Sequence, residues 1–182
     1  MKTSNDIKGW LHYRDFYDML LGILPEGGRV VEVGVFYGKG LIHLAQNQGG
    51  KGLNIYGVDA FRLRYDLSPY QDRDVQADED FYEKCVGNLF AAEVERQVTL
   101  ISLPSVRASA LFEDGSMDCV FIDAAHDEAS VIEDIKAWRP KVKPGGILAG
   151  DDYVPELEGV IPAVDKMVPD RKLMGPAWYT TV

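Results

Sequence analysis

The chain has 182 residues, of which 46% are hydrophobic and 26% are charged, as is typical of one globular domain with a full core. Its formal net charge is −10, which argues against a nucleic-acid backbone as substrate, because nucleic-acid-binding proteins usually carry a basic face. No apolar run is long enough to span a membrane, and the first residues lack the apolar core of a signal peptide. A small molecule is therefore the expected partner, with no nucleic acid and no membrane.

The chain contains two cysteines, and neither has the spacing of a metal ligand. Cys85 belongs to a helical pattern and Cys119 to the pattern of a buried strand. Both are therefore expected to be core residues of a protein in a reducing compartment, which predicts a cytoplasmic location.

The first part of the chain predicts a helix, a buried strand and a glycine turn. Apolar residues recur at helical spacing from Trp10 to Leu24, so an N-terminal amphipathic helix is expected over about 10–24, within residues 1–25. The apolar run 30–33 then predicts a strand buried on both faces. It ends at Gly34 and is followed, after further glycines, by a helical run that begins at Leu41. Strand, glycine turn and helix open a nucleotide-binding α/β fold.

The spacing of the glycines distinguishes between ligands. The dinucleotide pattern G-x-G-x-x-G fails, because Phe36 and Lys39 stand where it needs glycine. The turn instead reads Glu32-x-Gly34-x-x-x-Gly38, and the acid would repel a pyrophosphate but attract an ammonium or sulfonium group. This turn resembles the first motif, E-x-G-x-x-x-G, of the class I S-adenosylmethionine (SAM)-dependent methyltransferases. The alternative is a packing turn in another α/β protein.

The second strand is expected over 53–58 and is closed by Asp59. Asp59 lies close to the offset at which this fold places an acid on a ribose hydroxyl, and the alternative is an ordinary strand-end acid. Residues 61–78 show no clean period and are long for a connection, so they are predicted to form a lid or an insert.

Strand and helix patterns alternate through the rest of the chain. In order they predict a helix over 81–92, strand 98–103, a helix over about 105–112, strand 117–122, helix 131–138, strand 147–150, helix 160–168 and short strands 172–174 and 177–182. This order predicts a single domain over residues 1–182. Its fold class is α/β, a Rossmann-like doubly wound sheet of about seven mostly parallel strands with helices on both faces.

The segment from Phe121 to Tyr153 has the most specific pattern. It reads F-I-D-A-A-H-D-E-A-S-V and later W-R-P-K-V-K-P-G-G-I-L-A-G-D-D-Y. It is similar to a subfamily of small class I methyltransferases that includes the macrolide-sugar O-methyltransferases, with F-I-D-G-x-H-x-Y-x-x-V and W-x-P-x-L-x-P-G-G-x-L-x-x-x-D-Y. Two departures from the family matter for the site: Glu128 replaces the tyrosine of H-x-Y, and Gly40 stands where many relatives carry serine or threonine near the SAM carboxylate. That contact would pass to a backbone N–H.

The resemblance implies SAM as cofactor and S-adenosylhomocysteine as product. It places the cofactor against residues of the first two strand ends and of the segments that follow them. Glu32 and Gly34 would line the methionine end, and Asp59 would hold the ribose hydroxyls. Ala60 and Phe61 would lie beside the adenosine and Ser105 near the adenine. Tyr37, Gly38 and Asp123 would also bind the cofactor. For Ser105 the alternative is a helix cap.

Three aspartates follow the fourth and fifth strands, namely Asp123, Asp151 and Asp152. Neighbouring parallel strands lie roughly 5 Å apart, and two like charges about 4 Å apart repel by roughly 4 kcal/mol at an effective dielectric near 20. The cluster therefore needs a cation, a proton or water. Related O-methyltransferases hold Mg²⁺ with this pattern; the alternative is that one aspartate caps a loop and another contacts SAM, without a metal. His126, three residues after Asp123, could deprotonate a hydroxyl, or be structural.

The sequence thus predicts a SAM-dependent O-methyltransferase that acts on a hydroxyl of a small molecule, with Asp123 and His126 catalytic and with Mg²⁺ assistance. The alternatives are a metal-independent or N-directed methyltransferase, or a SAM-binding protein without catalysis. The acceptor is not identified, and a homo-oligomer stays open.

Overall fold

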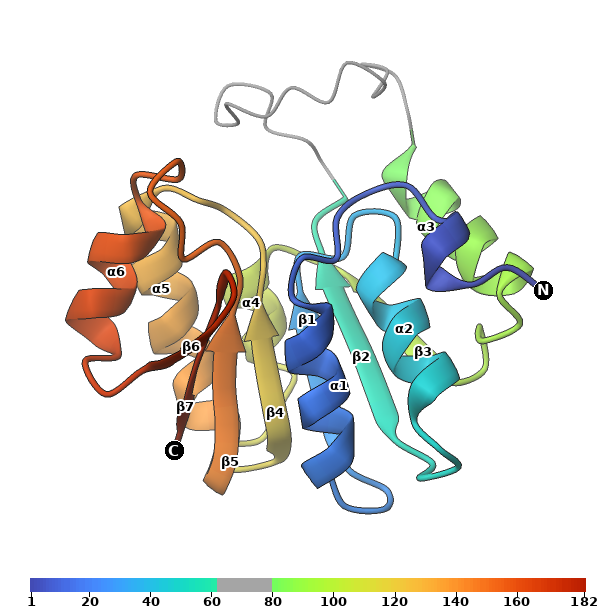
Figure 1. Cartoon of the computed structure of the whole chain (residues 1–182), viewed down its shortest axis with the longest axis horizontal. Helices are drawn as coiled ribbons and strands as arrows, with labels where there is room; N and C mark the ends of the chain where they lie inside the picture. The colour runs from blue at the N-terminus through green and yellow to red at the C-terminus, as the bar shows by residue number, and fades with distance from the viewer. Residues whose placement is uncertain (62–79) are drawn as a thin grey trace.

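The computed structural model describes residues 1–61 and 80–182, which form a seven-stranded sheet in the order β3-β2-β1-β4-β5-β7-β6 (Figure 1). The first five strands are parallel, whereas β7 runs antiparallel to β5 and β6. The carboxyl ends of β1 to β5 therefore meet at one edge of the sheet, the upper edge in Figure 1. The strands are β1 (Arg29–Val33), β2 (Asn54–Asp59), β3 (Val98–Ser102), β4 (Met117–Ile122), β5 (Val142–Gly150), β6 (Lys172–Met174) and β7 (Ala177–Thr181).

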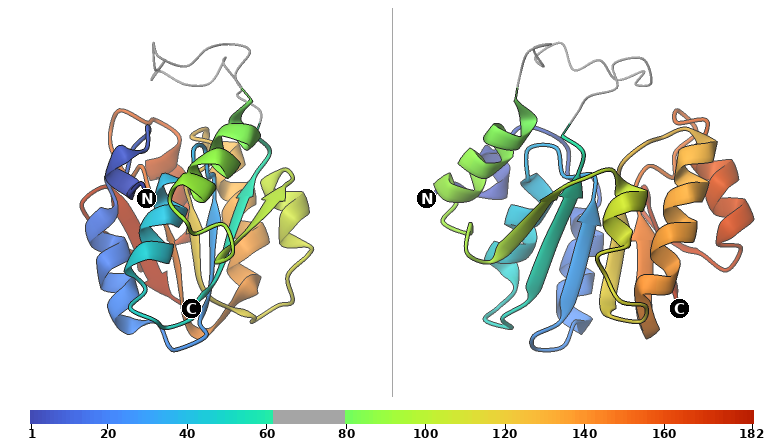
Figure 2. Two further views of the ribbon diagram at one scale, coloured as in Figure 1. Left: turned by 90° about the vertical axis from the view of Figure 1, so that its right-hand side faces the viewer. Right: turned by 180° about the vertical axis from the view of Figure 1, so that it is seen from behind.

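Helices cover both faces of the sheet (Figure 2). One face carries α1 (Arg14–Ile23), α2 (Lys39–Asn47) and α3 (Phe81–Ala91), and the other carries α4 (Ser105–Ser109), α5 (Glu128–Trp138) and α6 (Val160–Met167). Two 3₁₀ turns, η1 (Ser4–Asp6) and η2 (Arg139–Lys141), complete the described elements. The predicted doubly wound α/β fold is confirmed. None of the helices in the two described ranges has the length and apolar character needed to cross a membrane.

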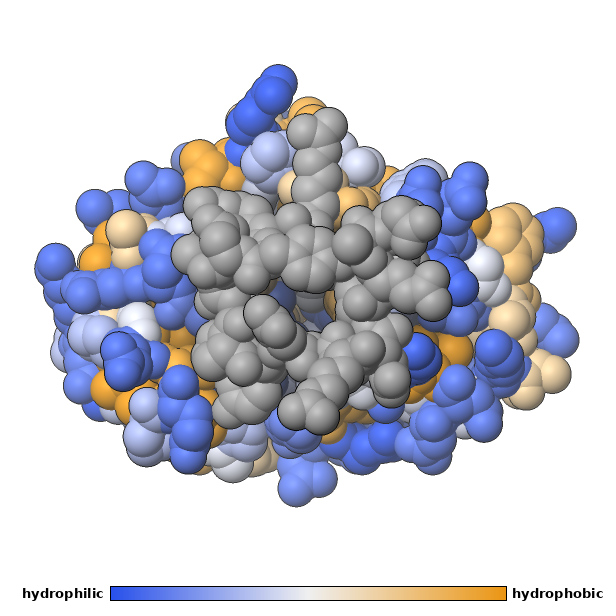
Figure 3. Space-filling model, turned by 90° about the horizontal axis from the view of Figure 1, so that it is seen from above, coloured by the Kyte–Doolittle hydropathy of each residue, from blue (hydrophilic) through white to orange (hydrophobic). Residues whose placement is uncertain are grey.

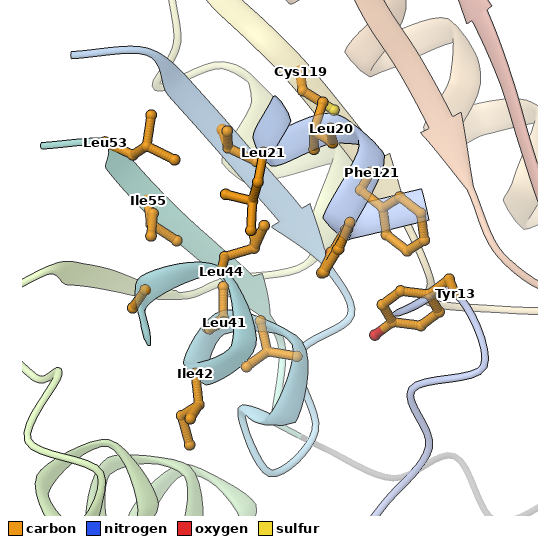
Figure 4. Packing of buried hydrophobic residues seen from close by; sticks show 14 of the residues in the cluster. Tyr13, Leu20, Leu21, Leu41, Ile42, Leu44, Leu53, Ile55, Cys119 and Phe121 are labelled. Atoms are coloured by element: carbon orange, nitrogen blue, oxygen red, sulfur yellow. The ribbon is translucent and has the colours of Figure 1, made fainter. Parts of the chain in front are cut away.

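The core lies in two layers, one on each face of the sheet. Val30 packs into the layer beneath α1 to α3, whereas Val31 and Val33 pack into the layer beneath α4 to α6. The strand β1 is therefore buried on both faces, as its apolar run predicts. Figure 4 shows the first layer, where side chains of α1 and α2 meet those of the strands. Cys85 and Cys119 are both buried free thiols of this layer.

The predicted start of the first helix is wrong. The helix α1 begins at Arg14, and Trp10 precedes it with 47% of its surface exposed. The ammonium group of Lys39, on α2, donates to the carbonyls of Ile7 and Gly9 at 3.0 and 2.8 Å, which holds this segment outside the helix. Trp10 therefore follows the helical period of the aromatic residues without belonging to the helix.

The predicted start of the fifth strand is also wrong, because β5 begins at Val142 and includes the Pro-Gly-Gly run that was expected to form a turn. The ammonium group of Lys143 donates to both carboxylate oxygens of Asp118 on β4 at 2.8 Å. The pairing of β4 and β5 shifts register between Met117 and Cys119, which accommodates the extra residues. The fourth helix ends at Ser109 instead of about 112.

The ends of β1 and β4 touch at Gly34. A Cβ atom on Gly34 would lie 1.6 Å from the carbonyl oxygen of Asp123, and the residue has φ +92°. The N–H of Asp123 donates to the carbonyl of Val33 at 2.7 Å, so the segments that follow β1 and β4 continue side by side beyond the strands. From the sequence, we expected glycine here because a ligand would approach the backbone closely. The structure shows that the backbone of Asp123, after β4, leaves no room for a side chain even without a ligand.

Replacing Gly34 with alanine is expected to destabilise the protein more than the same change at Gly49, which has φ +63° and, among the described residues, no neighbour within 4 Å of the place that a Cβ would occupy. Both changes place alanine in the left-handed region, at about 1–2 kcal/mol each, but only Gly34→Ala also collides with backbone. Urea unfolding of the two variants measures the difference. Equal losses would show that the backbone contact at Gly34 adds nothing.

Candidate active site

Five carboxylates lie at the carboxyl edge of the sheet. Glu32 is within β1, Asp59 ends β2, Asp123 follows β4, and Asp151 and Asp152 follow β5. Viewed onto this end, the described rim of the molecule is mostly hydrophilic (Figure 3). Like charges gathered at one edge repel one another, so each carboxylate needs a partner that offsets its charge.

Glu32 is sealed in the core, with 1% of its surface exposed. Burial raises the pKa of its carboxyl to about 8, opposed by a hydrogen bond from the Tyr17 hydroxyl and increased by the charge of Asp59. The Tyr17 hydroxyl donates to Oε2 at 2.8 Å. Glu32 is therefore largely protonated at neutral pH, and its predicted contact with the methionine end of the cofactor stays a prediction.

The buried carboxyl of Glu32 also explains why position 40 is glycine. A Cβ on Gly40 would lie 2.5 and 2.7 Å from the two carboxyl oxygens of Glu32. A side chain at this position would require the Glu32 carboxyl to shift. The first turn of α2 instead presents bare backbone at this point.

Asp59 organises the turn that follows β1. Its Oδ2 accepts hydrogen bonds from the backbone N–H groups of Val35 and Phe36 at 2.8 and 2.9 Å, and its Oδ1 accepts one from the N–H of Phe61 at 2.7 Å. Phe36 and Phe61 have φ of +51° and +50°, a strained region for bulky residues. A carboxylate offers about four acceptor positions, so about one remains for a ribose hydroxyl.

Asp123, His126 and Asp152 converge after β4 and β5. One potential ligand atom from each lies within 4.8 Å of the other two, and Nε2 of His126 is 2.8 Å from Oδ2 of Asp152. Asp151, which the sequence places in the metal set, is 5% exposed, and its Oδ1 has no hydrogen-bond partner among the described residues. The geometry thus brings His126 into the cluster and leaves Asp151 beside it with a buried, unpaired oxygen.

The carboxylates in this cluster are difficult to ionise together. Burial raises the pKa of Asp123 well above its ordinary value, and the charges of Asp152, Asp151 and Glu32 raise it further. Burial, followed by the charge of Asp152, raises the pKa of Asp151 to about 7. Protons therefore offset part of the repulsion when no cation is bound, and the cluster is suited to take up a proton or a divalent cation.

Two tyrosines of the N-terminal region belong to this site, and the sequence reasoning missed both. The Tyr17 hydroxyl donates to Glu32, whereas burial, followed by the charges of Glu32, Asp123 and Asp151, raises the pKa of Tyr13. Their spacing of four residues places both on one face of a helical pattern, where their rings were interpreted only as apolar surface. The hydroxyl groups were the available signal, because a buried tyrosine hydroxyl normally finds a polar partner.

Ser105 opens α4 and faces α5. Its hydroxyl donates to Oδ1 of Asp134 at 2.5 Å and accepts from Nε1 of Trp138 at 2.9 Å. The helix-cap alternative is not observed, because the N-cap residue is Pro104. The predicted place of Ser105 near the adenine stays a prediction, with its hydroxyl already engaged in a buried network.

The other predicted cofactor residues lie near the turn. Tyr37 is 3% exposed and its ring lies 3.9 Å from that of Phe36, between centroids. Gly38 is the N-cap of α2 with φ +83°. Ala60 is half-buried and follows β2. Of the predicted lid, residues 62–78 lie outside the described part of the chain.

Replacing Asp134 with asparagine is expected to change how stability depends on pH. Burial raises the pKa of Asp134 from 3.8 to about 6, opposed by the Ser105 hydrogen bond. The folded protein therefore holds this proton more tightly than the unfolded chain, and the associated stability is present below pH 4 and lost as pH rises to about 6. Asparagine can still accept from Ser105 but does not titrate. The stability of the natural protein relative to Asp134→Asn should fall by up to about 3 kcal/mol between pH 4 and 7.

Chemical unfolding at several pH values gives this difference directly. Parallel stability curves for the two proteins would contradict the assignment of a buried, titrating carboxyl at this position.

Comparisons with known proteins add the family. A family model described as a methyltransferase domain matches residues 31–153. No curated protein sequence gives a significant match. Similar solved structures include cofactor-bound Rv0187 from MTB, with 17% identity, a TM-score of 0.69 and coverage of 97% of this chain and 82% of that chain.

Two further structures have the same fold. A putative O-methyltransferase from Klebsiella pneumoniae has 17% identity and a TM-score of 0.68, covering 96% of this chain and 80% of that one. The O-methyltransferase from Bacillus cereus in complex with SAH has 16% identity and a TM-score of 0.62, covering 96% and 82%. At such identities the likeness shows the fold, whereas the family model spans more than half of the sequence. The chain therefore belongs to the methyltransferase-domain family, and its resemblance to the class I SAM-dependent methyltransferases is confirmed.

Proposed function

We propose that this methyltransferase methylates a hydroxyl group of a small molecule, with Asp123, Asp151 and Asp152 holding Mg²⁺ and His126 accepting the proton. The observation that carries the proposal is the convergence of Asp123, His126 and Asp152 within 4.8 Å, beside the unpaired buried oxygen of Asp151. Such a cluster combines ligands for a hard cation with a group that can remove a proton.

The turn after β1 supports the cofactor part of the proposal. The first turn of α2 points backbone N–H groups toward the carboxyl edge, and Gly40 leaves this turn without a side chain. The remaining acceptor position of Asp59 suits one hydroxyl of a ribose. When bound, SAM would supply an activated methyl group, and the residues of the site would hold the acceptor oxygen in line with it.

The donor set after β4 and β5 supports the metal. Asp123, Asp151 and Asp152 supply oxygen ligands, which Mg²⁺ prefers, and the unpaired Oδ1 of Asp151 is a buried acceptor that a cation would satisfy. The cation would lower the pKa of an acceptor hydroxyl and hold it in place. His126, next to these ligands, would remain available for the proton.

A second candidate is methyl transfer without a metal. It is favoured by the 2.8 Å contact between Nε2 of His126 and Oδ2 of Asp152, since a base held by a carboxylate is the arrangement used to activate a hydroxyl. In this case Asp152 would orient His126 and stabilise it after it takes the proton. The two candidates differ in whether removal of divalent cations abolishes turnover.

The acceptor is proposed to be small and neutral or positively charged, because the chain carries a net charge of −10 and the site is rich in acids. A hydroxyl is preferred to an amine because the site pairs a base with carboxylates that could assist deprotonation. Membership of the subfamily similar to the macrolide-sugar O-methyltransferases, and any homo-oligomer, stay predictions.

Turnover is expected to require a divalent cation. Purified protein is incubated with labelled SAM and a panel of hydroxylated small molecules, with Mg²⁺ or with chelator. Loss of methyl transfer in chelator and its return with Mg²⁺ would support the metal, whereas full activity in chelator would reject it and favour the His126–Asp152 pair.

Variants separate the two roles in the same assay. Asp151→Asn removes one charge at nearly constant shape and should lower metal affinity and turnover together. His126→Ala should lower turnover, by about 10²–10⁴-fold for a lost general base, with metal affinity retained. His12→Ala, at an exposed histidine before α1, is the matched control and should change neither quantity.

Calorimetry is expected to show binding of S-adenosylhomocysteine and weaker or no binding of NAD, because the glycine turn lacks the dinucleotide pattern. Asp59→Asn should weaken S-adenosylhomocysteine by at least about tenfold, since an amide cannot replace both carboxylate oxygens as acceptors. Tighter binding of NAD would overturn the cofactor assignment. Binding of S-adenosylhomocysteine without turnover on any acceptor would favour a non-catalytic protein.

A further inference from the structure

Two neighbouring loops carry the groups that the proposed reaction uses for proton transfer. The loop after β4 carries His126 and leads into α5, whereas the loop after β5 carries Asp152 and leads into α6. The helices α5 and α6 pack against each other on one face of the sheet (Figure 1). Nε2 of His126 and Oδ2 of Asp152, which are 2.8 Å apart, join the two loops close to the strand ends.

Gly159 joins the same two loops at their other end, where the helices begin. It is the N-cap residue of α6, and Asp127 is the N-cap residue of α5. A Cβ atom on Gly159 would lie 2.3 Å from the carbonyl oxygen of His126 and 2.4 Å from the backbone nitrogen of Glu128. It would also lie 2.7 Å from the carbonyl carbon of Asp127. The backbone of the β5 loop therefore rests directly on the backbone that carries His126.

Neither side of this contact can yield without movement of a loop. The atoms that a side chain at position 159 would meet belong to backbone, so they cannot rotate away as the end of a side chain can. On one side, Asp127 accepts a hydrogen bond from the N–H of Ser130 at 3.0 Å, which fixes the start of α5. On the other side, Leu157 is buried in the core layer beneath α4 to α6, and its carbonyl accepts from the N–H of Val160 at 3.2 Å. A methyl group at position 159 would therefore push the two loops apart.

The conformation of Gly159 itself does not require glycine. Its φ is −88° and its ψ is −25°, which lie in a region open to residues with side chains. Serine, threonine, aspartate and asparagine are all good N-caps, so the start of a helix does not require glycine either. The reason for glycine at this position is therefore the close approach of the β4 loop.

The junction of the two loops also borders a surface hollow of about 350 Å³. The hollow is lined by His126, Asp127, Glu128, Leu157, Glu158 and Gly159. The side chain of His126 keeps 28% of its surface exposed, so it is accessible to an acceptor molecule. A wider separation of the loops would thus change both the hollow and the contact between His126 and Asp152.

We propose that Gly159 is a positioning residue for methyl transfer: because it has no side chain, the β5 loop can rest on the β4 loop, and this contact keeps Nε2 of His126 at hydrogen-bonding distance from Oδ2 of Asp152. The inference rests on the proposed function, in which His126 accepts the proton of the acceptor hydroxyl. It applies with or without a metal, because His126 has this role in both candidate mechanisms. Gly159 touches no reactant in this assignment and acts through His126.

Gly159→Ala tests the proposal, with Gly146→Ala as the matched control. Gly146 lies in β5 beside Asp118, at the opposite end of β4 from Asp123, and a Cβ there would lie 3.0 Å from the carbonyl oxygen of Asp118. Both variants press one methyl group against backbone, so both should lower the midpoint of urea unfolding. Gly159→Ala should also lower kcat at least about tenfold, since a displacement of about 1 Å can cost about 10²-fold. Its KM for SAM should stay within about twofold, and Gly146→Ala should change neither constant.

Crystal structures of the two variants give the geometric result directly. In Gly159→Ala the distance between Nε2 of His126 and Oδ2 of Asp152 should exceed about 3.5 Å, which is too long for a hydrogen bond. In Gly146→Ala it should stay near the 2.8 Å of the natural protein. In a His126→Ala background, Gly159→Ala should lower kcat no further, because the group that it positions is already absent.

Several outcomes would overturn the proposal. An unchanged distance between His126 and Asp152 in Gly159→Ala would show that the contact does not set it. Equal losses of kcat in the Gly159 and Gly146 variants would indicate a general effect of destabilisation. A loss of kcat as large in the His126→Ala background as in the natural protein would show that Gly159 does not act through His126. Failure of Gly159→Ala to fold would assign this glycine to the packing of the whole fold.

The crystal structures separate this proposal from the proposed function. If the natural protein transfers no methyl group to any acceptor, the proposed function fails. The distance then decides alone, because a longer separation in Gly159→Ala still supports positioning of His126 beside Asp152, and an unchanged separation rejects it. If the natural protein is active and His126→Ala keeps full kcat, the role of His126 in the reaction is wrong, and the role of Gly159 in methyl transfer is rejected with it.

Discussion

The gathering of five carboxylates at one edge of a parallel sheet is the constraint on which the rest of this structure depends. Each carboxylate is offset in a different way. Glu32 is largely neutral at physiological pH, Asp59 accepts from three backbone N–H groups, and Asp152 contacts a histidine. The pKa of Asp123 is raised by burial and by the neighbouring acids, and Asp151 keeps one buried oxygen without a partner in the described chain. The carboxylates that still lack a compensating positive charge therefore lie after β4 and β5, where the proposed reaction needs a cation or a proton.

This constraint explains features that have no obvious role in the fold alone. The helix α1 packs on one face of the sheet and brings the Tyr17 hydroxyl to Glu32. Gly40 lies against the carboxyl of Glu32, which occupies the space that a Cβ would take. Asp152 adopts φ +66°, a left-handed conformation that is uncommon outside glycine, beside its contact with His126. Such local departures are expected where a site imposes its own geometry on the fold.

The fold could be predicted from the sequence because its strands are short apolar runs that end in polar residues. That rule brings Asp123 to the same edge as the aspartates after β5, but it cannot decide which oxygens meet, and so it did not separate Asp151 from His126. The errors arise where a side chain has two uses. Trp10 continues an aromatic period but lies outside α1, because Lys39 holds its backbone neighbours. Tyr17 fits an apolar helix face and also carries a hydroxyl that donates to Glu32. Periodicity records the ring and not the hydroxyl, so it predicts burial without the polar partner.

Asp59, which the resemblance assigns to the ribose, is already engaged in hydrogen bonds within the protein. Two of about four acceptor positions on its carboxylate are used by the turn after β1, and a third is used by the N–H of Phe61 after β2, so at most about one remains for a ribose hydroxyl. Two of its three donors belong to phenylalanines in the left-handed region, which the carboxylate helps to hold. A variant of Asp59 would therefore disturb the shape of the turn as well as any ribose contact. Loss of cofactor affinity in such a variant shows that the acid matters, but the hydrogen exchange of the Val35 and Phe36 amides is needed to attribute the loss to the turn or to the ligand.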